Sequence, residues 1–106
     1  MRTLVFDVKK QFIRKDLDCD FSCLIVGTVG YLRAQFKFSD DWDGCAKVAS
    51  FWLDNMEYPV LLDKEDSCLI PAEVLSSTMF KVSVTGAKGP KYRIKSGKTK
   101  VVQEVP

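Results

Sequence analysis

Side chains that could do chemistry are few in this sequence, and their spacing limits what the chain can do. The 106 residues include no histidine, which removes the commonest general base and every Ser-His or Cys-His nucleophile pair. The four cysteines, at positions 19, 23, 45 and 68, contain no CxxC pair and so give no zinc-ligand pattern. We therefore predict a protein that is not an enzyme, that needs no metal or cofactor, and whose thiols are free.

Two other segments could be taken for ligand sites. Asp40, Asp41 and Asp43 lie close together, but they lack the glycine placement and the terminal glutamate of a calcium loop, and turns need aspartate equally often. The segment Gly86-Ala87-Lys88-Gly89-Pro90 has neither the glycine spacing nor the following helix of a phosphate loop. We interpret the first as a turn and the second as a connector.

Charge is unevenly distributed along the chain, although the net charge is only +2. Residues 40–66 contain eight acidic residues and two lysines, whereas residues 88–100 contain six basic residues and no acid. Such polarity can aid association with a charged partner, although a charged stretch is more often a solvated face. Because the overall charge is weak for a nucleic-acid-binding domain, we favour a protein partner over nucleic acid.

Composition predicts one folded domain covering residues 1–106. Hydrophobic residues make up 46% and charged residues 28% of the chain, as in ordinary globular domains. No stretch approaches the roughly 20 apolar residues that cross a bilayer, and the segment after Arg2 is too short for the apolar region of a signal peptide. We expect neither a membrane span nor an export signal.

Alternation of apolar and polar residues predicts strands and very little helix. It is clearest over residues 31–38 and 79–86, and weaker strands are expected at residues 3–8, 11–17, 47–53, 55–62 and 68–70. Residues 24–30 are ambiguous between a strand and a packed loop. The predicted fold is all-β, a single antiparallel β-sandwich of the Ig-like or Greek-key kind, with at most one short helical turn near Pro71–Leu75. A small barrel is the alternative.

The C-terminal segment predicts a basic hairpin that turns at Ser96-Gly97. Pairing across this turn would direct Tyr92, Ile94, Thr99 and Val101 to the core and gather the cations on the solvent side. These cations are the candidate partner-binding residues, namely Lys91, Arg93, Lys95, Lys98 and Lys100. Like charges opposed in this way would be relieved by a negatively charged partner, although a solvated edge that resists aggregation is nearly as good an explanation.

Trp42, Gly44 and a set of alternating apolar residues have structural interpretations. Trp42 can close one end of the sandwich while its indole N–H donates to a loop carbonyl, and Gly44 permits a reversal with positive φ. The predicted core contains Phe36, Phe38, Phe51, Val82 and Val84.

Four blocks of sequence follow one another in an informative order. They are F-K-F-S-D-D-W-D-G at 36–44, K-V-A-S-F at 47–51, C-L-I-P-A-E-V-L at 68–75 and F-K-V-S-V-T-G at 80–86. This order resembles small phage and prophage tail or baseplate β-sandwich proteins of Gram-positive bacteria, with their F-x-F-S-x-x-W-x-G, I-P-x-E-V-L and F-x-V-S-V-x-G blocks. Residues 19–30 and the strongly basic C-terminal segment depart from that pattern.

The resemblance implies a non-catalytic module of the tail or baseplate that acts by protein–protein binding in the virion. Its structural motif residues would be Phe36, Phe38, Trp42, Gly44, Phe51 and Pro71. The alternative is a phage-encoded inhibitor of a bacterial defence system, anti-CRISPR-like or another kind, that acts in the host cytoplasm. The partner would be a phage tail protein in the first case and a host defence protein in the second, and self-association stays open.

Overall fold

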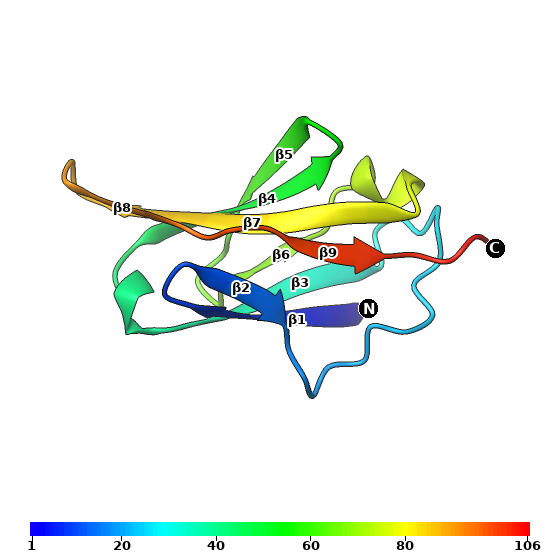
Figure 1. The fold of residues 1–106 in the computed structure, drawn as a ribbon, viewed down its shortest axis with the longest axis horizontal. Coiled ribbons are helices and arrows are strands. Elements are labelled where there is room, and N and C mark those ends of the chain that lie inside the picture. Colours follow the sequence, from blue (N-terminus) through cyan, green and yellow to red (C-terminus); the bar gives the residue numbers. More distant parts are fainter.

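The computed structural model describes residues 1–106 and contains nine strands and two 3-10 turns. The strands are β1 (Arg2–Lys9), β2 (Phe12–Lys15), β3 (Leu32–Phe38), β4 (Ala46–Leu53), β5 (Met56–Leu61), β6 (Ser67–Leu69), β7 (Met79–Lys88), β8 (Tyr92–Lys95) and β9 (Thr99–Val102). The turns are η1 (Asp40–Trp42) and η2 (Val74–Ser76). Two sheets pack against each other, so the predicted all-β sandwich is confirmed (Figure 1).

The first sheet has the strand order β2-β1-β3-β6, and the second has the order β5-β4-β7 with β8 and β9 both paired to β7. The molecule measures 45 × 29 × 21 Å. Figure 1 shows the hairpin of β7 and β8 projecting at one end beyond the other strands of the sandwich. This arm therefore exposes more of its backbone than the central strands do.

One strand pair departs from the antiparallel pattern that the sequence predicted. β1 and β3 run parallel, with Leu4 opposite Ala34 and Phe6 opposite Phe36, whereas all other strand pairs are antiparallel. A parallel pair needs a long crossover, and residues 10–31 supply it. Alternation within a strand does not report the direction of its neighbour, which is why the sequence could not reveal this pairing.

The structure contains two helical turns where the sequence predicted at most one. η2 overlaps the segment Pro71–Leu75, as expected, whereas η1 lies in the aspartate-rich turn after β3. In η1 the hydroxyl of Ser39 donates to Asp41 Oδ2 at 3.0 Å, and the amide of Trp42 donates to the carbonyl of Ser39 at 3.1 Å. Local hydrogen bonds of this kind suit a short 3-10 turn as well as an irregular one.

A single core of 20 buried hydrophobic residues fills the space between the sheets. Of the predicted core residues, Phe36, Phe51, Val82 and Val84 are buried, and Phe38 is half-buried against them. The rings of Phe6 and Phe36 stack with their centroids 5.3 Å apart, across the parallel strand pair. The core therefore takes aromatic side chains from the centre of both sheets.

Trp42 closes one end of this core, as its size and polarity predicted. The side chain is fully buried, and its Nε1–H donates to the carbonyl of Lys10 at 2.8 Å, which joins η1 to the turn between β1 and β2. Gly86 of β7 lies directly beneath the indole, because a Cβ atom there would approach Trp42 Cε3 to 2.8 Å. Gly44 has a φ of 75°, in the left-handed region that favours glycine.

The connection between β2 and β3 is irregular, and Arg2 holds it together. The Arg2 guanidinium donates to three backbone carbonyls of residues 20–23 at 2.6 to 3.3 Å. Further along, Ile25 forms an isolated parallel bridge with Glu104. The ambiguous segment 24–30 is thus a packed loop and not a strand.

Candidate protein-binding surface

The C-terminal segment is an interrupted edge strand, so the hairpin prediction is wrong. β8 pairs with residues 85–88 and β9 with residues 79–82 of the same strand, β7. The register shifts by one residue between the two, so that Ser96 and Gly97 together face Val84, which defines a β-bulge. Ser96 seals the bulge, because its amide donates to the Val84 carbonyl at 3.0 Å and its Oγ accepts from the Val84 amide at 2.9 Å. A Ser-Gly pair suits a bulge as well as a two-residue turn.

This bulge decides which side chains reach solvent. In an uninterrupted strand, residues 93 and 95 would lie on one face and residues 98 and 100 on the other. The extra residue restores the phase, so that Arg93, Lys95, Lys98 and Lys100 are all exposed and Tyr92, Ile94, Thr99 and Val101 are half-buried or buried. The two faces contain the residues that the sequence predicted, although a bulged edge strand produces them.

Lys81 of β7 joins these cations, because it lies directly opposite Lys100 of β9. We call the five residues Lys81, Arg93, Lys95, Lys98 and Lys100 the basic face. None of them forms an ion pair, since the four ion pairs of the structure all involve other cations. The fifth candidate from the sequence, Lys91, is exposed in the turn before β8 and lies outside this set.

Trp52 supplies an aromatic surface within the basic face. It lies on β4 directly opposite Lys81, and its indole N–H donates to Ser83 Oγ at 2.9 Å. The Nζ atom of Lys98 lies 3.8 Å from the centroid of the ring, which makes a close cation–π contact. Sequence reasoning missed Trp52 as a site residue. The available signal was its phase, because a residue next to buried Phe51 must face outward.

Exposed apolar side chains lie on the same side of the sheet as the basic face. Met79 and Val102 are opposite one another at one end of β7, where both are exposed. Leu61 of β5 is 69% exposed on the same side of the sheet, opposite Val48. The basic face is thus a charged surface of the sheet with exposed apolar side chains near it.

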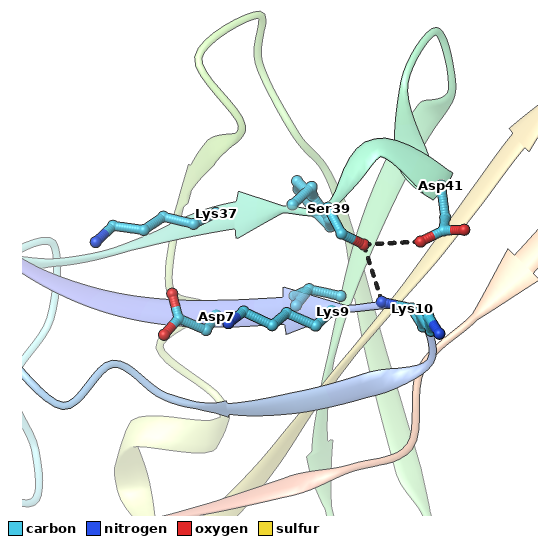
Figure 2. Close-up of a pocket in the computed structure, with 8 residues that line it drawn as sticks. Asp7, Lys9, Lys10, Lys37, Ser39 and Asp41 are labelled. Atoms are coloured by element: carbon cyan, nitrogen blue, oxygen red, sulfur yellow. Dashed lines mark hydrogen bonds between the residues drawn. The ribbon is translucent and has the colours of Figure 1, made fainter.

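Away from the basic face, a hollow of about 470 Å³ lies beside the ends of β1 and β3 (Figure 2). Several of its polar groups have partners within the chain. Ser39 Oγ accepts from the amide of Lys10 at 2.9 Å and donates to Asp41, as the dashed lines in Figure 2 mark, and Lys37 Nζ lies 2.7 Å from Asp16 Oδ2. These contacts fasten η1 to the turn between β1 and β2, so we assign this hollow a structural role.

The acidic residues of segment 40–66 are used mainly in turns and ion pairs. Asp63 Oδ1 accepts from two amides of the turn that leads into β6, and Asp63 Oδ2 lies 3.1 Å from Arg33. Asp66 is 3.1 Å from Lys47. No group of three or more histidine, cysteine or acidic side chains is arranged to hold a metal ion, and no helix has the length and apolar character to cross a membrane.

Three side chains in or beside the first sheet have shifted pKa values. The hydrogen bond from Lys37, with a second from the Asp18 amide, holds the pKa of Asp16 below its usual range. The same bond raises the pKa of Lys37. All four cysteines have free thiols, and burial raises the pKa of Cys68 to about 12, which keeps this thiol protonated and unreactive at neutral pH.

No protein-family model and no curated protein matches this sequence. The resemblance to phage tail or baseplate proteins therefore rests on the sequence blocks alone. Their most distinctive residues have structural positions here, because Trp42 is buried, Gly44 forms a turn and Pro71 is half-buried just before η2. The basic face lies mostly outside those blocks, on β8 and β9.

Proposed function

We propose that this chain is a non-catalytic β-sandwich module that binds a negatively charged protein partner through the basic face. One observation carries the proposal: five cations lie on one side of a sheet and none has a counter-ion within the chain, while Lys81 and Lys100 stand directly opposite each other. Like charges opposed across a strand pair are destabilising, and an acidic partner would relieve this repulsion. Trp52 adds the aromatic surface that such interfaces commonly use.

The setting that we propose first is a phage tail or baseplate, with a second tail protein as the partner. Its support is the order of the sequence blocks from Phe36 to Gly86. The second candidate is an inhibitor of a host defence protein in the infected cell. The polarised charge favours that role, since a compact basic face can compete for an acidic site on an enzyme. The two settings use the same face, so one set of variants tests both.

A charge-matched pair of variants tests the basic face. The first changes Arg93, Lys95, Lys98 and Lys100 to glutamine, and the control changes four cations elsewhere, Lys9, Arg14, Lys15 and Lys64, to glutamine. Each removes four positive charges, so the net charge falls from +2 to −2 in both. We expect both variants to fold. Only the first should bind the partner more weakly, and its remaining binding should depend less on the salt concentration. A folded first variant that keeps full binding would exclude the basic face.

Quantitative mass spectrometry supplies the binding measurement and separates the two settings. Wild type and both variants are expressed during infection, and the chain is measured in purified virions and in the cytoplasm. Incorporation into virions that the control keeps and the first variant loses supports the tail function. A chain found only in the cytoplasm, bound to a host protein through the same residues, contradicts the tail function and supports the inhibitor.

A further inference from the structure

The outward side of β8 is an unpaired strand edge. β8 pairs with no strand other than β7, and the amide of Ser96 donates to the Val84 carbonyl. Since successive amides of a strand alternate in direction, the N–H groups of Arg93 and Lys95 point away from β7. The carbonyl of Lys95 confirms this direction, because it accepts a bond from Gln11 Nε2, outside the sheet, at 3.1 Å.

The opposite edge of the second sheet is closed to strand addition by a proline. The amide of Leu62 donates to the carbonyl of Lys47 on β4 at 2.9 Å. Amide directions alternate along a strand, so the amide of Val60 also points toward β4 and residue 59 between them points away from it. Pro59 therefore lies at an outward position, where it offers no N–H group. Proline at such a position is a common device against the pairing of edges.

The edge of β9 is occupied near both of its ends. After β9, the amide of Glu104 donates to the carbonyl of Leu24 at 2.6 Å and its carbonyl accepts from Val26 at 2.9 Å. Before β9, the amide of Gly97 donates to the carbonyl of Gln11 at 3.0 Å. On the β8 side of the second sheet, Gln11 also occupies the Lys95 carbonyl. The open stretch of edge is therefore the part of the projecting β8 that offers both backbone groups of Arg93 and the amide of Lys95 (Figure 1).

A hollow of about 390 Å³ lies beside this open edge. It is lined by Lys10, Gln11, Asp41, Tyr92, Arg93 and Ile94. An extended chain laid along β8 would direct alternate side chains into this hollow, toward Ile94, and the others to the outer side. Residues on the outer side would stand directly opposite Arg93 and Lys95, at the distance of a cross-strand pair.

We propose that an extended protein segment with acidic residues at alternate positions adds to β8 as a further strand. The proposal rests on the proposed function and names the form of the partner at the basic face. Backbone hydrogen bonds to Arg93 and Lys95 supply affinity, and carboxylates opposite these cations supply selectivity. Pairing of β8 with a second copy of itself would oppose cation to cation, which disfavours self-association through this edge. Asp41 in the hollow likewise disfavours a nucleic acid strand.

Synthetic peptides test the strand geometry without altering the protein. The probe is a capped eight-residue peptide of alternating glutamate and valine, and the first control has the same composition with all glutamates in one half. Two further peptides carry N-methyl groups on the glutamates only or on the valines only. In strand addition the backbone amides of either the glutamates or the valines face β8 and form hydrogen bonds with it, but not both sets. We therefore expect one N-methylated peptide to bind about tenfold or more weakly and the other to bind like the parent.

A pair of substitutions makes the same test from the protein side. Arg93→Pro and Arg93→Gln both remove the charge, but only the proline removes the outward N–H group, and Pro59 shows that this fold accepts proline at such a position. We expect Arg93→Pro to bind the alternating peptide more weakly than Arg93→Gln. Slow hydrogen exchange at the amide of Ile94 verifies that β8 remains paired in both variants.

Each result decides one question. Equal binding of the two N-methylated peptides, or equal binding of Arg93→Pro and Arg93→Gln, overturns strand addition. If that occurs while the quadruple glutamine variant still loses its cellular partner, the basic face functions without strand addition and the proposed function stands. Tighter binding of single-stranded oligo-dT than of the alternating peptide would overturn the choice of an acidic protein segment as the partner.

Discussion

The outer faces of the two sheets differ in whether their cations have carboxylate partners within the chain. On the first sheet Arg14, Arg33 and Lys37 each have a carboxylate within 3.6 Å, whereas Lys9 at the end of β1 has none. On the second sheet the five cations of the basic face have none. The same strand architecture thus supports one face whose cations are mostly paired within the chain and another whose cations are left available to another molecule.

The charged side chains of the two faces also differ in how deeply they are buried. Asp16, which pairs with Lys37, is itself buried, whereas Lys81, Arg93, Lys95, Lys98 and Lys100 are all exposed. A charge pair that includes a buried member is coupled to folding, because separating it leaves a charge without its solvent or its partner. An exposed charge without a partner contributes little to stability and much to the local potential. The first face should therefore influence stability, and the second should influence binding.

The largest expected effect concerns what the two faces share, which is the core beneath them. Phe36 belongs to the first sheet and Phe51 to the second, and both rings are buried. Truncation of either residue to alanine should lower the free energy of unfolding by about 3–5 kcal/mol, because each leaves a cavity in the same core. Chemical denaturation measures this loss. Unchanged stability in both variants would refute the assignment of these strands to one sandwich.

A smaller effect is expected from the paired face, and it depends on pH. Because the folded state lowers the pKa of Asp16 below 3.8, this carboxylate contributes stability at neutral pH that is lost as the pH falls through its folded-state pKa. Asp16→Asn should therefore be less stable than wild type at neutral pH. The difference should shrink progressively in acid.

Denaturation curves collected across this pH range provide the measurement. A matched change on the other face, Lys95→Gln, removes an exposed charge that has no carboxylate partner and should leave the dependence in acid as in wild type. Parallel pH profiles for wild type and Asp16→Asn would show that the ion pair with Lys37 is not coupled to folding.

The smallest expected effect has the opposite sign and concerns the basic face. Lys100→Thr removes one member of the cation pair opposed across β7 and β9, and should raise the free energy of unfolding by about 0.2–0.5 kcal/mol at low salt. Added salt should cancel the gain, because screening weakens the repulsion in wild type. Lys64→Thr, in an exposed turn, is the control and should show no such gain. A loss of stability in Lys100→Thr at low salt would contradict the interpretation of this pair as repulsive.

Much of this fold was predictable from alternation within single strands. The strongest patterns, at residues 31–38 and 79–86, correspond to β3 and to most of β7. What the sequence could not reveal is which strands are neighbours. The parallel pair of β1 and β3, and the alignment of β8 and β9 along one partner, depend on contacts between distant segments, and the local residues are compatible with other pairings.

Four of the five residues of the basic face were predicted from the sequence, whereas Lys81, Trp52 and the strand arrangement that brings them together were not. The faces of residues 92–101 follow from the cation spacing, yet the same spacing fits a hairpin or a bulged strand. Trp52 was overlooked because its role depends on Lys98, which approaches it from a strand that no local pattern connects to β4. Side-chain contacts across a sheet require the strand order, which a single sequence does not contain.

The crossover from β1 to β3 also affects the time that the chain needs to fold. A hairpin such as β1 with β2 forms in microseconds, but β1 finds its second neighbour only when the chain returns through residues 10–31. Small β domains with distant pairings of this kind reach the native state on the order of milliseconds to seconds. Until then Phe6 and Phe36 lack their stacking partners, so refolding at high protein concentration should compete with aggregation through these exposed aromatic strands.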